Sequence, residues 1–227
     1  MKLVALDDLI IIGAGGIGVQ VADAVDEINK KGSRWNLRGF LDDDEKKRGL
    51  DICGYPVLGK IDDAGIFDDC FFLLAVGNST NYYVKKKVFK KLAVDRQRFA
   101  TVVHPDATVS RHASLGFGTA VLAGARVMAE TTVGDHVAIL CNSYIGHNDN
   151  IGDFVTVTNS ASVAGFTKIE EGCYIGMNSS IIERVRIGKW SLVGMGSMVL
   201  RDLPPFSVVV GNPGRIIKTQ DPSIFDV

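Results

Sequence analysis

The chain has 227 residues, with 25 Lys and Arg against 26 Asp and Glu, and its formal net charge at pH 7 is -1. This balance argues against a nucleic-acid-binding protein, which usually carries a basic face. The apolar fraction of 46% is ordinary for a globular protein. The longest apolar run without glycine, residues 71–76, is far shorter than the roughly 18 residues that cross a bilayer. We therefore expect a globular chain that neither binds nucleic acid nor inserts into a membrane.

The N-terminal segment and the cysteines point to the cytoplasm. Asp7 and Asp8 interrupt the apolar stretch that a signal peptide needs. The four cysteines are scattered without a CxxC motif, a spacing that suits neither a disulfide framework nor a zinc site. We expect a reducing, cytoplasmic location and no metal.

The first part of the chain alternates between strand and helix patterns. Residues 9–12, 37–41 and 70–76 read as buried strands. Residues 19–30 and 79–92 have helical spacing, and the second of these predicts an exposed basic face formed by Lys85, Lys86, Lys87, Lys90 and Lys91. Strand alternating with helix indicates a parallel sheet covered by helices.

After His104 the pattern changes to a repeat of six residues. Every sixth residue from Val109 to Val199 is Val, Ile or Leu, without a slip, and the position four residues after each is nearly always small. A period of six fits neither a helix nor a hairpin sheet, and it is typical of a solenoid of short strands joined by tight corners. With three strands per coil, these hexads predict about five coils.

The sequence thus predicts an α/β plus β-solenoid fold. Residues 1–104 form a nucleotide-sugar-binding α/β domain that is half of a Rossmann fold, 105–201 form the β-helix, and 202–227 form a C-terminal tail that contributes to the CoA site. A short solenoid has open apolar ends and faces, so we expect an oligomer.

Several motifs together resemble one family. The hexapeptide repeat and the tail 208–215 (VVVGNPGR) resemble the left-handed parallel β-helix acyltransferases. The segments GAGGIG (13–18), GFLDD (39–43), AVGN (75–78) and VHPDA (103–107) resemble the bacterial nucleotide-sugar acyltransferases of the PglD/NeuD type. The resemblance extends over almost the whole chain, from about residue 9 to 218.

The resemblance implies acetyl-CoA-dependent acetylation of an amino group on a nucleotide-linked sugar, of the UDP-4-amino-sugar or GDP-perosamine type. It also implies a homotrimer, with acetyl-CoA in the groove between neighbouring β-helices and the nucleotide sugar on the N-terminal domain. The substrate contacts that it implies, with the flanking motif positions, are Gly13, Gly15, Gly16, Ile17, Asp42, Asp43, Gly77 and Asn78. Ile17 departs from relatives that carry a polar residue there.

The glycine loop has a meaning of its own. Gly13, Gly15 and Gly18 form a G-x-G-x-x-G motif between a strand and a helix, where backbone N–H groups favour a phosphate. Asp42, at a strand end, suits ribose hydroxyls. In isolation this motif predicts dinucleotide binding, but an α/β part that ends near residue 104 has room for only about half of the two-lobed fold. The alternative without a ligand is that the glycines serve helix–strand packing.

Four histidines are present, and His147 stands out. His104 precedes a proline and is expected to shape a turn, and His112 and His136 fall where exposed corners are expected. Beside His147 lies Asp149, the one charged residue at a small-residue position. The resemblance makes His147 the general base. Relatives place Glu or Asp directly after it, where this chain has Asn148, so we expect Asp149 to replace that carboxylate in part.

The predicted mechanism is direct attack of the sugar amine on the thioester, with His147 as the base. A backbone N–H near Gly165 or Gly176 is expected to stabilise the oxyanion. By resemblance, Met177 and Met195 line the CoA groove and Arg215 meets a CoA phosphate. Relatives often carry a second histidine where this chain has Thr156. We include Thr156 among the predicted cofactor-binding residues, together with Gly165, Met177, Met195 and Arg215.

Other functions remain open from the sequence. One histidine base serves a hydroxyl acceptor equally well, as in sugar or sialic acid O-acetylation. A non-catalytic hexapeptide-repeat scaffold is the alternative of a different class. A γ-class carbonic anhydrase shares the solenoid, but the spacing of His112, His136 and His147 does not match its zinc ligands.

Overall fold

A parallel sheet forms the centre of the N-terminal domain in the computed structural model, which describes residues 6–32 and 34–225. The strand order is β3-β4-β2-β1-β5, and the four strands other than β3 run parallel. The bounds of these strands are β1 (Asp7–Ile12), β2 (Trp35–Leu41), β3 (Asp51–Ile52), β4 (Tyr55–Gly59) and β5 (Phe71–Leu74). The short β3–β4 hairpin has no counterpart in the sequence prediction.

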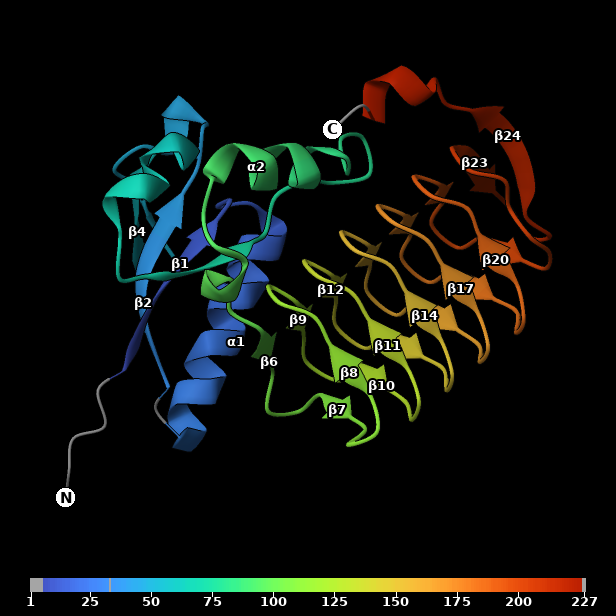
Figure 1. Cartoon of the computed structure of the whole chain (residues 1–227), viewed down its shortest axis with the longest axis horizontal. Coiled ribbons are helices and arrows are strands. Elements are labelled where there is room, and N and C mark those ends of the chain that lie inside the picture. The colour runs from blue at the N-terminus through green and yellow to red at the C-terminus, as the bar shows by residue number, and fades with distance from the viewer. Residues whose placement is uncertain (1–5, 33, 226–227) are drawn as a thin grey trace.

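Two helices cover the sheet, one on each face (Figure 1). The helix α1 (Gly16–Gly32) buries Val21, Ala22 and Val25 in a core that also contains Ala138 and Leu140 of the β-helix. This helix therefore lies between the sheet and the solenoid. The helix α2 (Val84–Leu92) packs on the opposite face, with Val88 and Leu92 in that core. Short 3-10 helices lie at Glu45–Lys47, Ile61–Ile66, Arg96–Arg98 and Pro222–Phe225.

The prediction of an exposed basic face on a helix over residues 79–92 is partly wrong. Residues 79–83 form turns rather than helix, because the Asn78 and Asn81 side chains accept backbone N–H groups there. Lys85, Val88 and Leu92 recur at helical spacing on the face that turns inward, so Lys85 is only 1% exposed rather than solvated.

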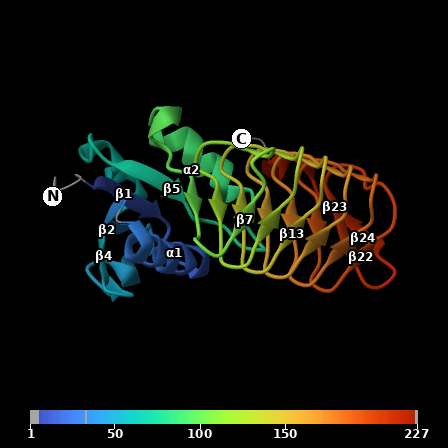
Figure 2. The same cartoon turned by 90° about the horizontal axis from the view of Figure 1, so that it is seen from below.

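The hexads fold into a triangular prism of two-residue strands (Figure 2). The second residue of most of these strands, from Val121 to Val199, is buried in one continuous core, which confirms the predicted repeat. Each strand pairs in parallel with the strand eighteen residues later, as Val127 does with Ile145, so three strands make a coil.

Three sheets form the faces of the prism. The six-stranded face contains β7 (Thr108–Val109), β10 (Arg126–Val127), β13 (Tyr144–Ile145), β16 (Ser162–Val163), β19 (Ser180–Ile181) and β22 (Met198–Val199). The five-stranded face contains β8 (Ser114–Leu115), β11 (Thr132–Val133), β14 (Asn150–Ile151), β17 (Lys168–Ile169) and β20 (Arg186–Ile187). The eight-stranded face contains β6 (Val102–Val103), β9 (Ala120–Val121), β12 (Ala138–Ile139), β15 (Thr156–Val157), β18 (Tyr174–Ile175), β21 (Leu192–Val193), β23 (Ser207–Val210) and β24 (Arg215–Thr219).

The corners of the coils line up as three edges. The open edge joins the six- and five-stranded faces at residues 129–130, 147–148, 165–166 and 183–184. The covered edge joins the five- and eight-stranded faces at 117–118, 135–136, 153–154, 171–172 and 189–190. The groove edge joins the eight- and six-stranded faces at 123–124, 141–142, 159–160, 177–178 and 195–196. The N-terminal domain packs on the eight-stranded face and the covered edge, and it leaves the open edge free.

Candidate active site

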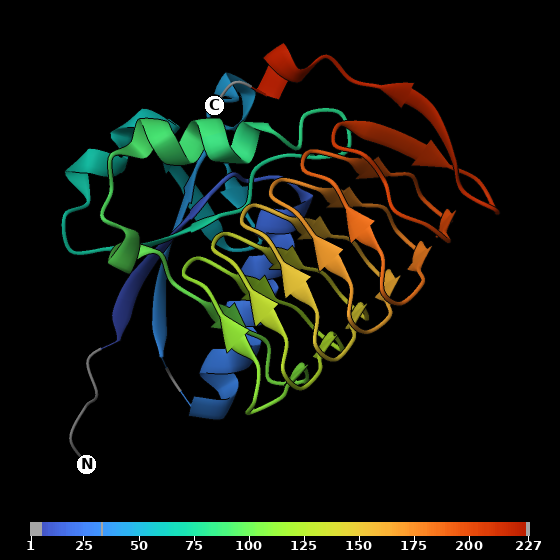
Figure 3. The same cartoon turned by 45° about the vertical axis from the view of Figure 1, so that its right-hand side comes forward.

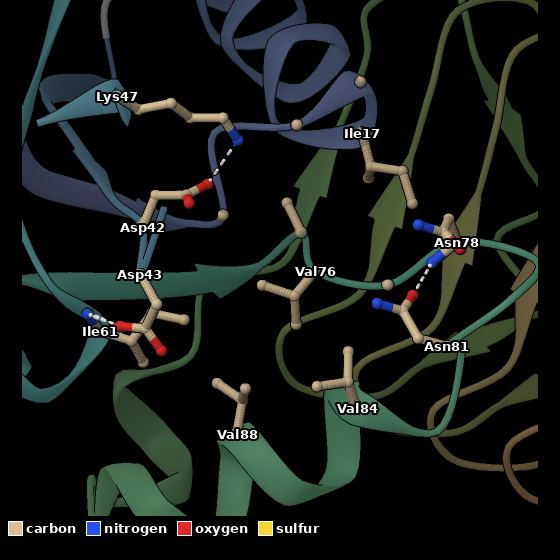
Figure 4. A pocket seen from close by; sticks show the side chains of 15 residues that line it. Ile17, Asp42, Asp43, Lys47, Ile61, Val76, Asn78, Asn81, Val84 and Val88 are labelled. Atoms are coloured by element: carbon tan, nitrogen blue, oxygen red, sulfur yellow. Dashed lines mark hydrogen bonds and ion pairs between the residues drawn. The ribbon is translucent and has the colours of Figure 1, made fainter. Parts of the chain in front are cut away.

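A cavity of about 370 Å³ opens where β1, β2 and β5 end (Figure 4). Gly15, Gly16 and Ile17 form one side, and Asp42 and Asp43 follow the end of β2. The segment after β5 supplies its other wall, and the residues from that segment and from α2 are Val76, Gly77, Asn78, Asn81, Val84 and Val88. All eight predicted substrate positions therefore line this cavity, and it lies at the carboxyl edge of the sheet, where ligands bind in such folds.

The glycines of the loop have two separate roles. Gly13 has φ +105°, and an added Cβ would lie 2.7 Å from Val76 Cγ1. A Cβ on Gly18 would lie 2.1 Å from the Gly13 carbonyl oxygen, so these two glycines permit close packing. Added Cβ atoms at Gly15 and Gly16 would meet nothing within 4 Å. These two glycines leave the first N–H groups of α1 open to the cavity, which suits a phosphate.

Asp42 is tied into the protein rather than free. Its carboxylate accepts hydrogen bonds from the N–H of Ala14 (2.7 Å) and of Asp44 (2.8 Å), and it pairs with Lys47 Nζ at 3.0 Å (Figure 4). Burial alone would raise the pKa of Asp42, but these hydrogen bonds and the lysine hold it below its usual value. Asp42 thus holds the glycine loop in place, and its contact with a ribose stays a prediction.

The cavity also contains residues that the sequence reading missed. Lys47 contributes an ammonium group beside Asp42, and Asn81 Oδ1 accepts the N–H of Asn78 at 2.8 Å. The side chain of Asp43 accepts the N–H of Ile61 at 2.9 Å. The one sequence signal for Asn81 was its place three residues after Asn78, a spacing typical of a turn.

Two further cavities continue the first along the eight-stranded face. The second, of about 250 Å³, shares Gly16, Ile17, Gly77 and Asn78 with the first, and it adds Gln20, Leu140, Thr158, Asn159, Tyr174 and Met177. The third, of about 230 Å³, shares Thr158, Tyr174 and Met177 with the second and reaches Gly176, Gly194 and Met195. We call these three cavities the substrate groove. It runs from the glycine loop to the groove edge and contains Met177 and Met195.

His147 lies on the open edge, at the turn between β13 and β14, and its side chain is exposed. Its Nδ1 lies 2.9 Å from Asn148 Oδ1, and Phe166 packs edge-on against the ring at 5.0 Å. An added Cβ at Gly165 would lie 3.0 Å from the ring atoms Cε1 and Nε2. Asn148 and Gly165 therefore fix the orientation of the imidazole. With Nδ1–H donated to Asn148, Nε2 keeps a free lone pair.

Asp149 does not take the place of the missing carboxylate at the ring, contrary to expectation. It is 2% exposed and turns inward, where Oδ1 accepts the N–H of Thr167 at 2.8 Å. Burial raises the pKa of Asp149 to about 7. Small polar residues at this repeat position bridge neighbouring coils, as Thr131 does, and Asp149 serves the same structural purpose. The partner of the imidazole is Asn148.

Thr156 is also misplaced by the sequence reading. It is buried beneath α2, and its Oγ1 accepts a hydrogen bond from Lys85 Nζ at 2.9 Å. Because this hydroxyl lies inside the contact between the two domains, it is not free to contact an acetyl group. Burial lowers the pKa of Lys85 to about 7. Arg215, in contrast, is exposed on β24, and its contact with CoA stays a prediction.

The other histidines have structural surroundings. His104 Nδ1 accepts the N–H of Asp106 at 3.0 Å and so closes the expected turn. His136, expected at an exposed corner, is 1% exposed because α2 brings Phe89 against its ring, at 4.5 Å. His112 is exposed. Over residues 6–32 and 34–225, no group of three or more His, Cys, Asp or Glu side chains is placed to hold a metal ion.

The described part of the chain has no helix long and apolar enough to cross a membrane.

Comparison with known proteins gives consistent matches. Residues 8–92 match the family model of the PglD N-terminal domain, and residues 166–201 match that of the bacterial transferase hexapeptide (six repeats). The chain is 32% identical over 119 residues to a UDP-N-acetylbacillosamine N-acetyltransferase of Bacillus subtilis. That match spans 52% of this chain and 52% of the relative, about half the length of each.

Two solved structures resemble the whole chain. The acetyltransferase domain of PglB from Neisseria gonorrhoeae, in complex with acetyl coenzyme A, is 28% identical with a TM-score of 0.81, over 94% of this chain and 100% of that one. PerB from Caulobacter crescentus, in complex with CoA and GDP-perosamine, is 25% identical with a TM-score of 0.81, over 94% of this chain and 99% of that one.

Proposed function

Because the chain belongs to the PglD-type family of hexapeptide-repeat acetyltransferases, we propose that it transfers the acetyl group of acetyl-CoA to an amino group on a nucleotide-linked sugar. The observation that carries this proposal is the substrate groove, which joins a phosphate-binding glycine loop to the two methionines assigned to CoA. Relatives named for UDP-N-acetylbacillosamine and GDP-perosamine support a nucleotide sugar as the acceptor.

In this proposal the nucleotide lies in the first cavity. Its phosphates meet the N–H groups at Gly15 and Gly16, where the N-terminus of α1 favours negative charge. The sugar then extends into the second cavity, where the amides of Gln20 and Asn159 provide hydrogen-bonding groups. The third cavity, with Met177 and Met195, takes part of CoA.

The proposed chemistry is a direct transfer. The amine nitrogen attacks the thioester carbonyl carbon, and His147 Nε2 removes a proton from the amine as the bond forms. Of the two predicted oxyanion donors, the backbone N–H near Gly165 fits better, because the N–H of Gly176 is donated to the carbonyl oxygen of Val193 at 2.8 Å. The C–S bond then breaks, and the CoA thiolate receives the proton. The four cysteines are unpaired thiols, and none lies beside His147. This arrangement supports transfer without an acetyl-cysteine and a site of action in the reducing cytoplasm.

The base and the groove lie on different parts of one chain, which supports the proposed homotrimer. His147 is on the open edge, whereas the β-helix residues that line the groove belong to the eight-stranded face and the groove edge. A second copy that places its open edge over this groove completes the site. Such a head-to-tail contact closes into a ring when the rotation is threefold, as the triangular section of the prism allows.

The reaction is tested by incubating the protein with acetyl-CoA and a panel of UDP- and GDP-linked amino sugars, and by following free thiol release. We expect release that depends on one amino sugar, with an N-acetylated product by mass spectrometry. Release without any amino-sugar dependence would contradict the proposal. An O-acetylated product from a hydroxyl acceptor would contradict the assignment of the amine.

The shared site is tested by complementation. His147→Ala removes the base, and Gly15→Leu fills the first cavity from a position where the backbone leaves open space. Each variant alone is expected to be inactive. Co-assembly in equal amounts should restore about a quarter of the activity, because some sites then combine an intact base with an intact groove. If mixed trimers are verified and still show no activity, His147 and the groove that it serves belong to the same chain.

A further inference from the structure

The last described residues return from the far end of the β-helix to the N-terminal domain (Figure 3). After β24 the chain turns at Gln220, and the 3-10 helix Pro222–Phe225 lies against the segment that leads into α2. We call residues 220–225 the C-terminal brace. The sequence predicts that the tail 202–227 contributes to the CoA site, and the proposed mechanism gives residues 220–225 no role.

An aromatic cluster holds the brace in place. Phe225 is 4% exposed, and its ring centroid lies 5.4 Å from that of Trp190 and 5.9 Å from that of Tyr82. Tyr83 and Phe206 contact the same ring at 5.6 and 5.4 Å. Trp190 belongs to the covered edge of the β-helix, and Tyr82 belongs to the N-terminal domain. Phe225 therefore joins both domains in one buried contact, of a kind that contributes substantially to stability.

Hydrogen bonds also join the brace to the N-terminal domain, and the N-terminal domain to the β-helix. Gln220 Nε2 donates to Tyr82 Oη at 2.5 Å, and Tyr82 Oη donates to the carbonyl oxygen of Trp190 at 2.9 Å. Lys87 Nζ of α2 donates to the Ile224 carbonyl at 3.4 Å. Burial raises the pKa of Tyr82 to about 12, so its hydroxyl remains a donor at neutral pH. The position of Tyr82 is thus fixed from the brace on one side and from the β-helix on the other.

Tyr82 stands at the end of the loop that lines the substrate groove. Residues 75–83 supply Gly77 and Asn78 to the first two cavities, Asn81 to the first and Ser79 to the third. A Cβ on Gly77 would lie 3.4 Å from the Cα of Tyr82, so the backbone of Tyr82 packs directly behind the groove wall. The ring of Tyr82 also packs on Tyr174, a wall residue of two cavities, at 5.9 Å.

We propose that the C-terminal brace is a positioning element for the acceptor substrate: Phe225 and Gln220 hold Tyr82, and through it the loop 75–83, in the conformation that binds the nucleotide sugar. The inference rests on the proposed function for the identity of that substrate. Among the described residues, no hydrogen bond or ring contact joins the brace to a lining residue of the first cavity, so its residues act through Tyr82 rather than on the reacting atoms. Loss of the brace leaves His147 and the glycine loop unchanged.

The test compares Phe225→Ala with Ile224→Ala, which changes the neighbouring side chain of the same turn, 39% exposed. For Phe225→Ala, we expect the KM for the amino sugar to rise about tenfold, equal to about 1.4 kcal/mol of lost binding. The kcat is expected to stay within about twofold of the parent, and the KM for acetyl-CoA is expected to rise less than that for the amino sugar, because the loop supplies only Ser79 to the third cavity. Ile224→Ala should match the parent, and Phe225→Trp should restore part of the binding.

A second readout does not depend on turnover. Amide hydrogen exchange at residues 77–83 should be faster in Phe225→Ala than in Ile224→Ala, while exchange in β13 and β14 around His147 stays the same. Gln220→Ala, which removes only a hydrogen bond, serves if Phe225→Ala does not fold. Unchanged exchange at 77–83 would overturn the proposal, as would an equal loss of kcat and of both substrate affinities.

Failure of the proposed acetyltransferase function can be distinguished from failure of the proposal for the brace. If the parent protein releases no thiol with any amino sugar, calorimetric binding of UDP and of GDP replaces the KM measurement. Weaker nucleotide binding in Phe225→Ala, with faster exchange at 77–83, then supports the brace on its own. Equal binding and equal exchange in the two variants would reject it.

Discussion

The covered edge and the open edge of the β-helix are built from the same kind of corner, yet their side chains differ. On the covered edge, the left-handed corner positions hold His136, Phe154 and Trp190, all buried under the N-terminal domain or the C-terminal brace. On the open edge, the equivalent left-handed positions hold Glu130, Asn148, Phe166 and Arg184, all exposed. The hexad repeat fixes the turn, and what covers an edge decides whether its residues serve packing or chemistry.

The largest effect is expected at the open edge. His147→Ala should lower kcat by about 10² to 10⁴, because the general base is lost. The exposed ring supports little of the core, so circular dichroism and the thermal midpoint should remain those of the parent. Thiol release with the best amino sugar gives kcat. Full turnover in a folded His147→Ala protein would remove this residue from the mechanism.

The histidine of the covered edge should affect stability and its pH dependence instead. Burial lowers the pKa of His136 to about 4, from an ordinary value of 6.5. Between these values the unfolded chain binds a proton that the folded protein does not, so His136 destabilises the fold as pH falls from about 6.5 to 4. His136→Leu lacks this penalty.

Urea unfolding of both proteins measures the difference. Between pH 7 and 4, the free energy of unfolding of His136→Leu relative to the parent should increase by about 3 kcal/mol. The buried Asp149 titrates with the opposite sign in this range, but it is present in both proteins and cancels in the comparison. A constant difference across this range would show that the ring of His136 can be protonated in the folded state.

Gly165→Ala tests how closely the open edge holds its base. The added Cβ would lie 2.9 Å from the carbonyl oxygen of His147 and 3.0 Å from Nε2, so the ring or the backbone must move. We expect kcat to fall about 10- to 100-fold, because a displaced base loses its alignment with the amine. The control is Gly65→Ala, at an exposed position of the 3-10 helix Ile61–Ile66 where φ is not positive and an added Cβ meets nothing within 4 Å. Equal kcat values in the two variants would contradict close positioning.

The smallest effect concerns Asn148. Asn148→Ala removes the acceptor of Nδ1–H and should lower kcat/KM about tenfold. Asn148→Asp keeps the acceptor and adds a negative charge beside the imidazole, where it attracts a positive charge on the ring. Its pH–rate profile should therefore shift upward on the acidic limb by about 0.5 to 1 pH unit. An identical acidic limb in both proteins would show that His147 is not the titrating group.

Asn148 suits the backbone of its turn as well as the imidazole beside it. It has φ +60°, a left-handed conformation that asparagine adopts more readily than most side chains. The amide thus suits the turn and still accepts from the ring, while the charge of a carboxylate is absent.

Much of the fold was predictable because its signal is periodic. The aliphatic residue of each hexad, such as Ile145 or Val163, fills the interior whatever surrounds the prism, so sixteen such positions fixed the solenoid. The β3–β4 hairpin was missed because two short segments around Gly54 carry no such period. Lys85 was misread because a lysine is normally solvated, and only the packed domain shows that its face of α2 is inward.

The parts of the site that depend on a local backbone motif could be predicted from the sequence. The parts that depend on packing between distant segments could not. The glycine loop at 13–18 and the exposure of His147 follow from local sequence. The inward turn of Asp149, the burial of Thr156 and the arrival of Phe225 beside Tyr82 each depend on residues far away in the chain. No local pattern contains that information.

The separation of His147 from the substrate groove has a consequence for how the proposed activity responds to abundance. In the proposed homotrimer, His147 of one copy meets the groove of another, so the specific activity should decline when the protein is diluted until the copies dissociate. In that range the total rate of acetylation would rise more steeply than the protein concentration. A modest change in expression would then cause a larger change in the amount of acetylated sugar.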